Sequence, residues 1–120
     1  MDVTAVSVLV VDDDSGLRTL SRIVLELEGF QVREASSLRE VEEALAAERP
    51  DVVLLDVHLG NEHTEEVFAE LRAKGIAVAA VTGTADLVDV RDWADETLAK
   101  PFDPAQLVAM TKRLARVDGA

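Results

Sequence analysis

The chain has 120 residues, 48% hydrophobic and 30% charged, which suits one globular domain spanning residues 1–120 around a single core. Its formal net charge is −12 and its lysines and arginines form no cluster, which argues against direct binding to nucleic acid. Cysteine is absent, which excludes disulfides and thiolate sites, and the apolar runs are too short to cross a membrane. We therefore expect a soluble, cytoplasmic protein that does not bind membranes.

The chain begins with an alternation of β-branched runs and segments of helical period, which is typical of βα units around a parallel sheet. A strand is predicted at 6–11, almost wholly apolar, as in strands buried on both faces. A helix follows, with an apolar stripe over 17–27 and Gly29 as its C-terminal cap. The next strand, at 30–35, alternates like a more exposed one.

The second helix has a recognisable start and end. Ser37 followed by Glu40 predicts a capping box, and Pro50 closes the helix. The third strand, at 52–55, is fully apolar and ends in the carboxylate of Asp56. Such a run predicts a central strand of the sheet.

The following segment continues the pattern less regularly. A helix is predicted at 64–74, ending at Gly75, and a fourth strand at 76–81. Residues 85–92 suffice for two helical turns at most, and a short fifth strand is predicted at 96–99.

The last helix carries a complete start signal. Asp103 is the predicted N-cap, Pro104 stands at the first helical position and Gln106 closes a capping box. Phe102 is placed to pack onto Leu107, and the helix should end near residue 117. The whole predicts an α/β fold of five βα units.

Polar residues stand where four of the strands end. In an open parallel sheet, ligands bind at the carboxyl ends of the strands. The residues at this edge are Asp12, Asp13, Asp14, Asp56, Thr82 and Lys100. Each alone is more often a cap, a turn residue or a solvated side chain, and we assign Asp14 to capping. Together, three carboxylates, a hydroxyl and an ammonium group predict a hard divalent cation beside an anion.

Over essentially its full length, the chain resembles the receiver domains of response regulators in two-component signalling. The matching segments are Val10 to Asp13, Leu54 to Asp56, Thr82-Gly83 and Lys100 to Phe102. The resemblance implies a flavodoxin-like, doubly wound parallel sheet of strand order 2-1-3-4-5. It also implies a cis peptide bond before Pro101.

The resemblance also implies the chemistry. Asp56 would accept a phosphoryl group from a sensor histidine kinase, a phosphotransfer protein or a small phosphodonor, giving an acyl phosphate. A Mg²⁺ ion would be bound directly by Asp13 and Asp56, through water by Asp12, and by the backbone carbonyl of His58. Thr82 and Lys100 would bind the phosphoryl oxygens. Such a domain catalyses its own phosphorylation and dephosphorylation and is not a turnover enzyme.

The family further implies a downstream protein or output domain that reads the phosphorylated surface, and some receivers form homodimers. Three features depart from the family. Leu59-Gly60 and Thr64 replace the usual Met-Pro and a glycine, so we expect a mobile loop after Asp56. Thr97 stands where the family usually has an aromatic switch residue. Thr82 and Lys100 lie 18 positions apart, about one helical turn fewer than expected, which resembles the atypical FAT GUY receivers with a short or irregular fourth helix.

Alternatives stay open at this point. A pseudo-receiver would keep the fold and signal by constitutive protein contact. A haloacid-dehalogenase-type phosphatase is disfavoured because the run after the first strand lacks that family's Asp-x-Asp-x-Thr spacing. Trp93 is either part of the core or an exposed anchor for a partner, with the core favoured. The side chains of His58 and His63 are expected in solvent.

Overall fold

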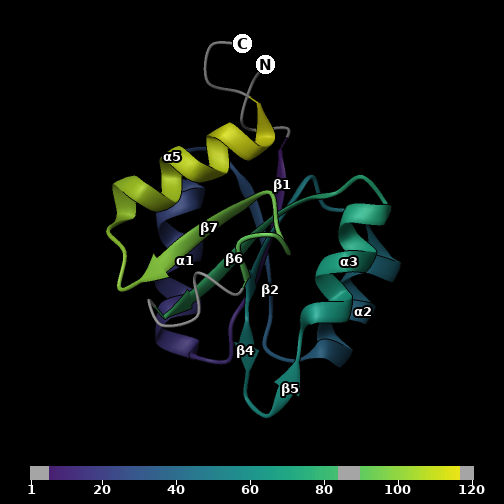
Figure 1. The fold of residues 1–120 in the computed structure, drawn as a ribbon. Helices are drawn as coiled ribbons and strands as arrows, with labels where there is room; N and C mark the ends of the chain where they lie inside the picture. The colour runs from purple at the N-terminus through teal and green to yellow at the C-terminus, as the bar shows by residue number, and fades with distance from the viewer. Residues whose placement is uncertain (1–5, 84–89, 117–120) are drawn as a thin grey trace.

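The computed structural model describes residues 6–83 and 90–116. Strands and helices alternate along the chain, as Figure 1 shows. The elements are β1 (Ser7–Val11), α1 (Ser15–Leu27), β2 (Gln31–Ala35), α2 (Leu38–Ala47), β3 (Val52–Asp56), β4 (His58–Leu59), β5 (Glu62–His63), α3 (Glu65–Ala73), β6 (Ala77–Gly83), β7 (Glu96–Lys100) and α5 (Pro104–Ala115).

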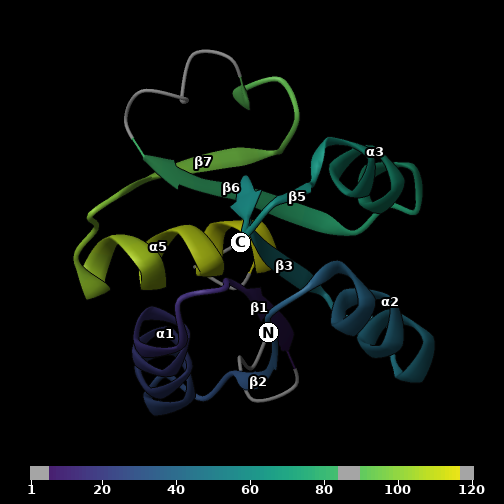
Figure 2. The same cartoon turned by 90° about the horizontal axis from the view of Figure 1, so that it is seen from below.

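Five of the strands form one parallel sheet in the order β2-β1-β3-β6-β7. Since β6 and β7 are the fourth and fifth strands predicted from the sequence, the predicted order 2-1-3-4-5 is confirmed. Helices α1 and α5 cover one face of the sheet and α2 and α3 the other, as Figure 2 shows. Among the described residues, no helix is long and apolar enough to cross a membrane.

The two-residue period of the central strands divides the core into two halves. Leu9 and Leu55 point toward α2 and α3, where they share a cluster with Phe68. Val10 and Leu54, one position away, belong to the opposite cluster with α1 and α5. Each fully buried large apolar side chain stabilises the fold by about 1.5–3 kcal/mol, so both clusters hold the sheet edge in place.

The helix starts follow the sequence signals with one correction. Asp14 caps α1 by accepting from the backbone N–H of Leu17, as predicted. The capping box of α5 is present in full. At α2, Ser37 accepts from the N–H of Glu40, but the Glu40 carboxylate accepts from Ser36 and not from Ser37. The predicted reciprocal bond is therefore displaced by one residue.

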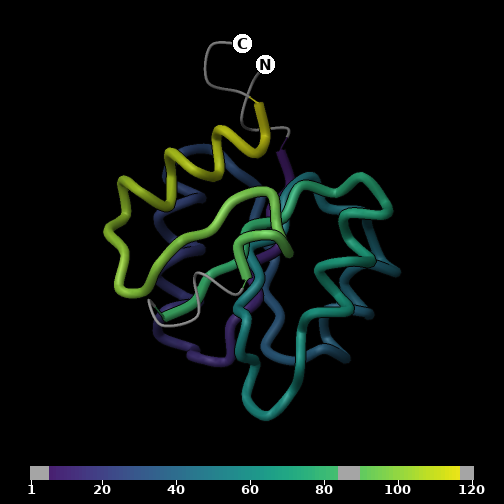
Figure 3. Tube along the Cα trace, in the orientation of Figure 1, coloured from purple at the N-terminus to yellow at the C-terminus, as the bar shows by residue number. Residues whose placement is uncertain are grey.

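The segment after Asp56 contains a turn that the sequence did not predict. It folds back as an antiparallel hairpin, with His58 opposite His63 and Leu59 opposite Glu62. Gly60 makes the turn with a φ of 61°, a conformation that favours glycine. Figure 3 shows this hairpin as the teal loop that extends below the sheet.

Three further predictions concern the Lys100–Pro101 peptide bond, Trp93 and the segment 85–92. The Lys100–Pro101 peptide bond is cis, as the resemblance implies. Trp93 is half-buried and packs with its ring 5.8 Å from that of Phe68, so the core reading is confirmed. Most of the short helix predicted at 85–92 falls on residues 84–89, which lie outside the described residues.

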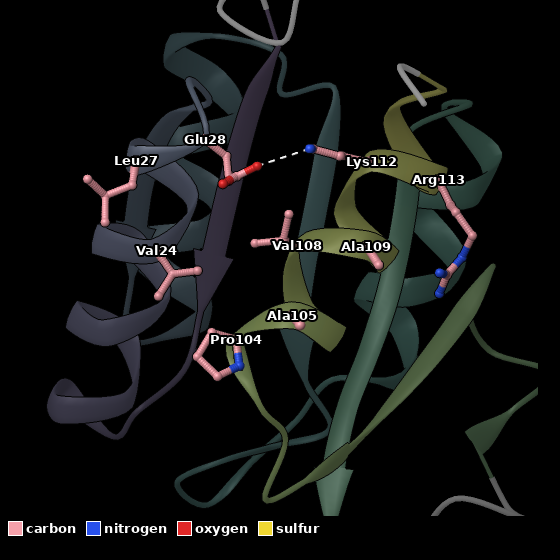
Figure 4. Close-up of a pocket in the computed structure, with 9 residues that line it drawn as sticks. All are labelled: Val24, Leu27, Glu28, Pro104, Ala105, Val108, Ala109, Lys112 and Arg113. Atoms are coloured by element: carbon pink, nitrogen blue, oxygen red, sulfur yellow. Dashed lines mark ion pairs between the residues drawn. The ribbon is translucent and has the colours of Figure 1, made fainter. Parts of the chain in front are cut away.

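A surface groove lies between α1 and α5 (Figure 4). Its apolar floor includes Val24 and Val108, and an ion pair of 3.0 Å between Glu28 and Lys112 crosses it. Leu27 borders the groove with 81% of its surface exposed. None of the lining residues is among the predicted site residues.

Candidate functional site

The sheet register brings the predicted polar residues to one edge. Asp56 is the last residue of β3 and lies opposite Val81, so Thr82 comes one position further along β6. Lys100 ends β7 opposite Gly83, and Asp12 directly follows β1. Because the strands are parallel, their carboxyl ends meet at this edge and gather residues from four separate parts of the chain.

Three carboxylates cluster there. Oxygen atoms of Asp12, Asp13 and Asp56 all lie within 4.8 Å of one another. Asp12 and Asp56 are buried, with side chains only 6% and 7% exposed, whereas Asp13 is exposed. Of the three acids, only Asp13 is therefore exposed to solvent.

Lys100 bridges the two buried acids. Its Nζ donates to Asp12 Oδ2 and to Asp56 Oδ2, both at 2.9 Å. The ammonium group is therefore drawn into the predicted site and is not a solvated surface charge, although its side chain keeps 26% exposure. It compensates one negative charge of three, which leaves a formal excess of two.

The pKa values at this edge follow from burial and from the bridge. Burial raises the pKa of Asp56, and hydrogen bonding to Lys100 offsets only part of that effect. Burial by itself would lower the pKa of Lys100, but its hydrogen bonds and charge interactions with Asp12 and Asp56 raise it overall. The lysine is thus firmly protonated, while the central carboxylate is costly to ionise without a further cation.

Backbone amides orient the carboxylates. Asp12 Oδ1 accepts from the N–H of Asp14 at 2.8 Å, and Asp56 Oδ1 accepts from the N–H of His58 at 3.0 Å. Asp13 Oδ2 accepts from the N–H of Gly60 at 3.1 Å, which ties this acid to the hairpin turn. These bonds fix the direction of each acid before any ligand is present.

The arrangement suits a divalent cation. Carboxylate oxygens are preferred ligands of Mg²⁺, and two oxygens bound to the same Mg²⁺ ion are at most about 4.2 Å apart. The oxygens of the Asp12, Asp13 and Asp56 cluster lie within 4.8 Å of one another, close enough for side-chain rotation to bring them around one ion. One divalent cation would also neutralise the excess of two negative charges. The acid cluster therefore fits the metal that the resemblance implies.

The remaining predicted site residues are placed as follows. Thr82 is buried, with 1% exposure, at the carboxyl edge of β6. The side chain of His58 is exposed, and its backbone N–H donates to Asp56 Oδ1. His63 is exposed on β5, and Thr97 lies half-buried on β7 opposite Ala80.

Two contacts near the site were not predicted from the sequence. Arg18 on α1 donates from Nη1 to the backbone carbonyl of Asp12 at 2.7 Å. Thr64 is fully buried, and its hydroxyl donates to the carbonyl of Val57 at 2.8 Å, where the sequence indicated only a departure from a glycine. The available sequence signal for Arg18 is its position on the polar side of α1, in series with Arg22 and Glu26.

Comparison with known proteins places this site in a family context. The sequence model described as the response regulator receiver domain matches residues 8–112. The DNA-binding response regulator MtrA of Mycobacterium tuberculosis is 38% identical over 124 residues, covering 98% of this chain and 54% of that protein. The transcriptional regulatory protein GltR of Pseudomonas aeruginosa is 33% identical over 118 residues, covering 92% and 49%. The chain thus spans about half the length of the curated relatives it matches.

Solved structures share the fold. The receiver domain of NtrX from Brucella abortus superposes with a TM-score of 0.85 at 23% identity, covering 92% of this chain and 99% of that one. The chemotaxis response regulator CheY4 of Vibrio cholerae gives a TM-score of 0.82 at 25% identity, covering 91% and 98%. A response regulator from Chloroflexus aurantiacus gives 0.83 at 27% identity, covering 92% and 97%.

Proposed function

The chain belongs to the response regulator receiver family, and from this premise we propose that it is a phosphoryl-operated switch whose acceptor is Asp56. The observation that carries the proposal is the position of this carboxylate. It is the one acid of the site that ends a central strand, and it lies within reach of both Lys100 and the acids that follow β1.

The transfer step would use one carboxylate oxygen of Asp56 as nucleophile. The oxygen forms a bond to phosphorus as the P–N bond of a phosphohistidine, or the P–O bond of acetyl phosphate, breaks. The electron pair leaves with the imidazole or the acetate, and the product on the protein is an acyl phosphate. The phosphoryl donor and Asp56 are both anionic, so the reaction needs positive charge around the transferred group.

Lys100 supplies part of this charge. Its ammonium group already contacts Asp56 Oδ2, so a small displacement would let it bind a phosphoryl oxygen instead. The hydroxyl of Thr82, at the neighbouring strand end, is proposed to bind another phosphoryl oxygen. Both groups stand on strands of the sheet, which holds them with little conformational freedom.

We propose that Asp13 and Asp56 bind Mg²⁺ directly, Asp12 binds it through water, and the backbone carbonyl of His58 completes the protein ligands. When bound, the ion would neutralise the charge that the phosphoryl group brings to an acidic pocket. The excess negative charge of the site and the raised pKa of Asp56 support this requirement.

The output of the switch is proposed to lie outside the described domain. A sensor histidine kinase or phosphotransfer protein would donate the phosphoryl group, and an output domain or separate protein would read the changed surface. DNA binding, which the name of the mycobacterial relative states, would belong to such an output, because the net charge of −12 of this chain repels DNA. A pseudo-receiver is not favoured, since the acids and the lysine are assembled.

The proposal is tested by intact mass spectrometry after incubation with acetyl phosphate. We expect one added phosphoryl group with Mg²⁺, little without it, and none in Asp56→Asn. Asp51→Asn is the matched control, because Asp51 precedes the same strand at its opposite end. Equal phosphorylation with and without Mg²⁺ would contradict the metal requirement, and a full adduct on Asp56→Asn would contradict the acceptor.

A further inference from the structure

The backbone of the acidic turn after β1 is held by a side chain from the neighbouring helix. Arg18 Nη1 lies 2.7 Å from the carbonyl oxygen of Asp12, and Arg18 Nε lies 3.0 Å from Glu34 Oε1 on β2. The other Glu34 oxygen accepts from Arg22 Nε at 2.8 Å. One guanidinium group therefore connects the acidic turn, α1 and the edge strand.

From this network we infer that Arg18 is a positioning residue for the metal site, a role that rests on the proposed function of that site. The carbonyl of Asp12 belongs to the peptide unit that joins Asp12 to Asp13. Fixing this unit restricts the directions in which the Asp13 side chain can leave the backbone, and the N–H of Gly60 holds its carboxylate at the other end. Asp13 is the exposed member of the acid cluster, so packing contributes least to its placement.

Among the described residues, the other groups of the turn hold the N–H and carboxylate of Asp12 and the carboxylate of Asp13, and Arg18 holds the carbonyl between them. The N–H of Asp12 donates to the carbonyl of Ala35, and its carboxylate is held by Lys100 and by the N–H of Asp14. Arg18 supplies the contact to the carbonyl. Its side chain is only 18% exposed, and Glu34 holds it from the far side, which limits its rotation.

The sign of the effect separates positioning from simple electrostatics. Arg18 carries a positive charge next to a site for a dication, so its charge alone opposes Mg²⁺ binding. If charge were its whole effect, removing it would strengthen Mg²⁺ binding. If it positions Asp13, removing it should weaken binding, by about tenfold, as is typical when groups supporting metal ligands are lost.

The test is a Mg²⁺ titration of the wild type, Arg18→Met, Arg18→Lys and Arg22→Met, followed by the backbone amide NMR signals of Asp13 and Gly60. These two amides lie at the acidic turn and at the hairpin turn it contacts. Arg22→Met is the matched control, because Arg22 carries the same charge and also contacts Glu34 but does not contact the Asp12 carbonyl. The spectra also show whether each variant is folded.

We expect a Kd about tenfold higher for Arg18→Met, partial recovery in Arg18→Lys and a Kd close to the wild-type value for Arg22→Met. At saturating Mg²⁺, the phosphorylation rate of Arg18→Met should approach that of the wild type, because Arg18 does not contact the acceptor. A folded Arg18→Met that binds Mg²⁺ as tightly as the wild type, or more tightly, would overturn the inference.

The remaining outcomes also decide. If Arg18→Met does not fold, the test uses Arg18→Lys, which keeps the charge. Weaker Mg²⁺ binding than in the wild type then supports the positioning role, and unchanged Mg²⁺ binding refutes it. A wild type that binds no Mg²⁺ would overturn the proposed metal site together with this role. That result differs from a wild type that binds Mg²⁺ and an Arg18→Met that binds it equally well.

Discussion

Replacing Lys100 by methionine should destabilise the metal-free protein substantially. Lys100→Met keeps most of the side-chain length but removes the cation that bridges Asp12 and Asp56 at 2.9 Å. Two carboxylates that are 6% and 7% exposed would then face each other without a counterion. Breaking a buried ion pair typically costs about 3–5 kcal/mol.

The expected loss here is smaller, because the lysine side chain is itself 26% exposed and water can replace part of it. We expect a decrease of about 2–3 kcal/mol in the free energy of unfolding. For a domain of 120 residues, this corresponds to a Tm lower by roughly 8–12 °C.

The assay is thermal and urea unfolding followed by circular dichroism, in EDTA and in Mg²⁺. Lys74→Met is the matched control, because Lys74 pairs with Glu70 on an exposed helix surface, where such pairs contribute about 0–1 kcal/mol. Mg²⁺ should raise the Tm of Lys100→Met more than that of the wild type, since a dication can replace the lost charge. If Lys100→Met and Lys74→Met lose the same small amount of stability, the bridge does not stabilise the site.

Three further predictions concern the same edge of the sheet. Asp13→Ala should weaken Mg²⁺ binding while leaving urea stability of the metal-free protein unchanged or higher, because it removes a like charge; a clear loss of stability would make Asp13 structural. Thr64→Val should lower the free energy of unfolding by about 1–3 kcal/mol by leaving the buried carbonyl of Val57 unpaired, and Thr64→Ser should retain most of it. Burial raises the pKa of Asp56 above its ordinary value of 3.8, so the folded protein retains this proton to higher pH than the unfolded chain, and stability falls as pH rises through that range. Without Mg²⁺, the stability of Asp56→Asn relative to the wild type should therefore be greater at about pH 7 than at about pH 4. The same difference in unfolding free energy at both pH values would contradict the raised pKa.

The sheet and the acid cluster were predictable because their causes are local. Continuous apolar runs such as Val52 to Leu55 mark central strands, and parallel strands bring their carboxyl ends to one edge. The start of α5 was predictable for the same reason, since its cap residues interact within four positions of one another. Local signals of this kind place Asp56 and Lys100 at strand ends, whereas the strand order was implied by the family resemblance.

The contacts that hold the site were not predictable, because they depend on how the chain turns between its elements and leave no repeating pattern in the sequence. Arg18 looks like any solvated residue of an amphipathic helix until the fold places the carbonyl of Asp12 beside it. Thr64 appeared only as an exception to a family pattern, yet its hydroxyl satisfies a buried carbonyl seven residues earlier. The hairpin at Gly60 was likewise not predicted, because two-residue strands carry almost no periodicity.

The hydrogen bonds of Glu40 show that a predicted cap can be present with a partner one residue away from the expected one. A capping box and the observed contact to Ser36 differ by one residue and use the same carboxylate. The side-chain and backbone hydrogen bonds of Ser36 lower the pKa of Glu40, so the group is ionised where it supports the helix start. The residue types predicted the Ser37 cap correctly, but the partner of the Glu40 carboxylate is Ser36, one residue earlier.

The most direct test of the central claim is to locate the phosphoryl group chemically. Borohydride reduces an aspartyl phosphate to homoserine, and peptide mapping then identifies the converted residue. After treatment with acetyl phosphate and Mg²⁺, we expect homoserine at position 56 and unchanged aspartate at Asp12 and Asp13. Homoserine at either of those two positions, or at none of the three in a protein whose mass shows the adduct, would contradict the assignment of Asp56 as the acceptor.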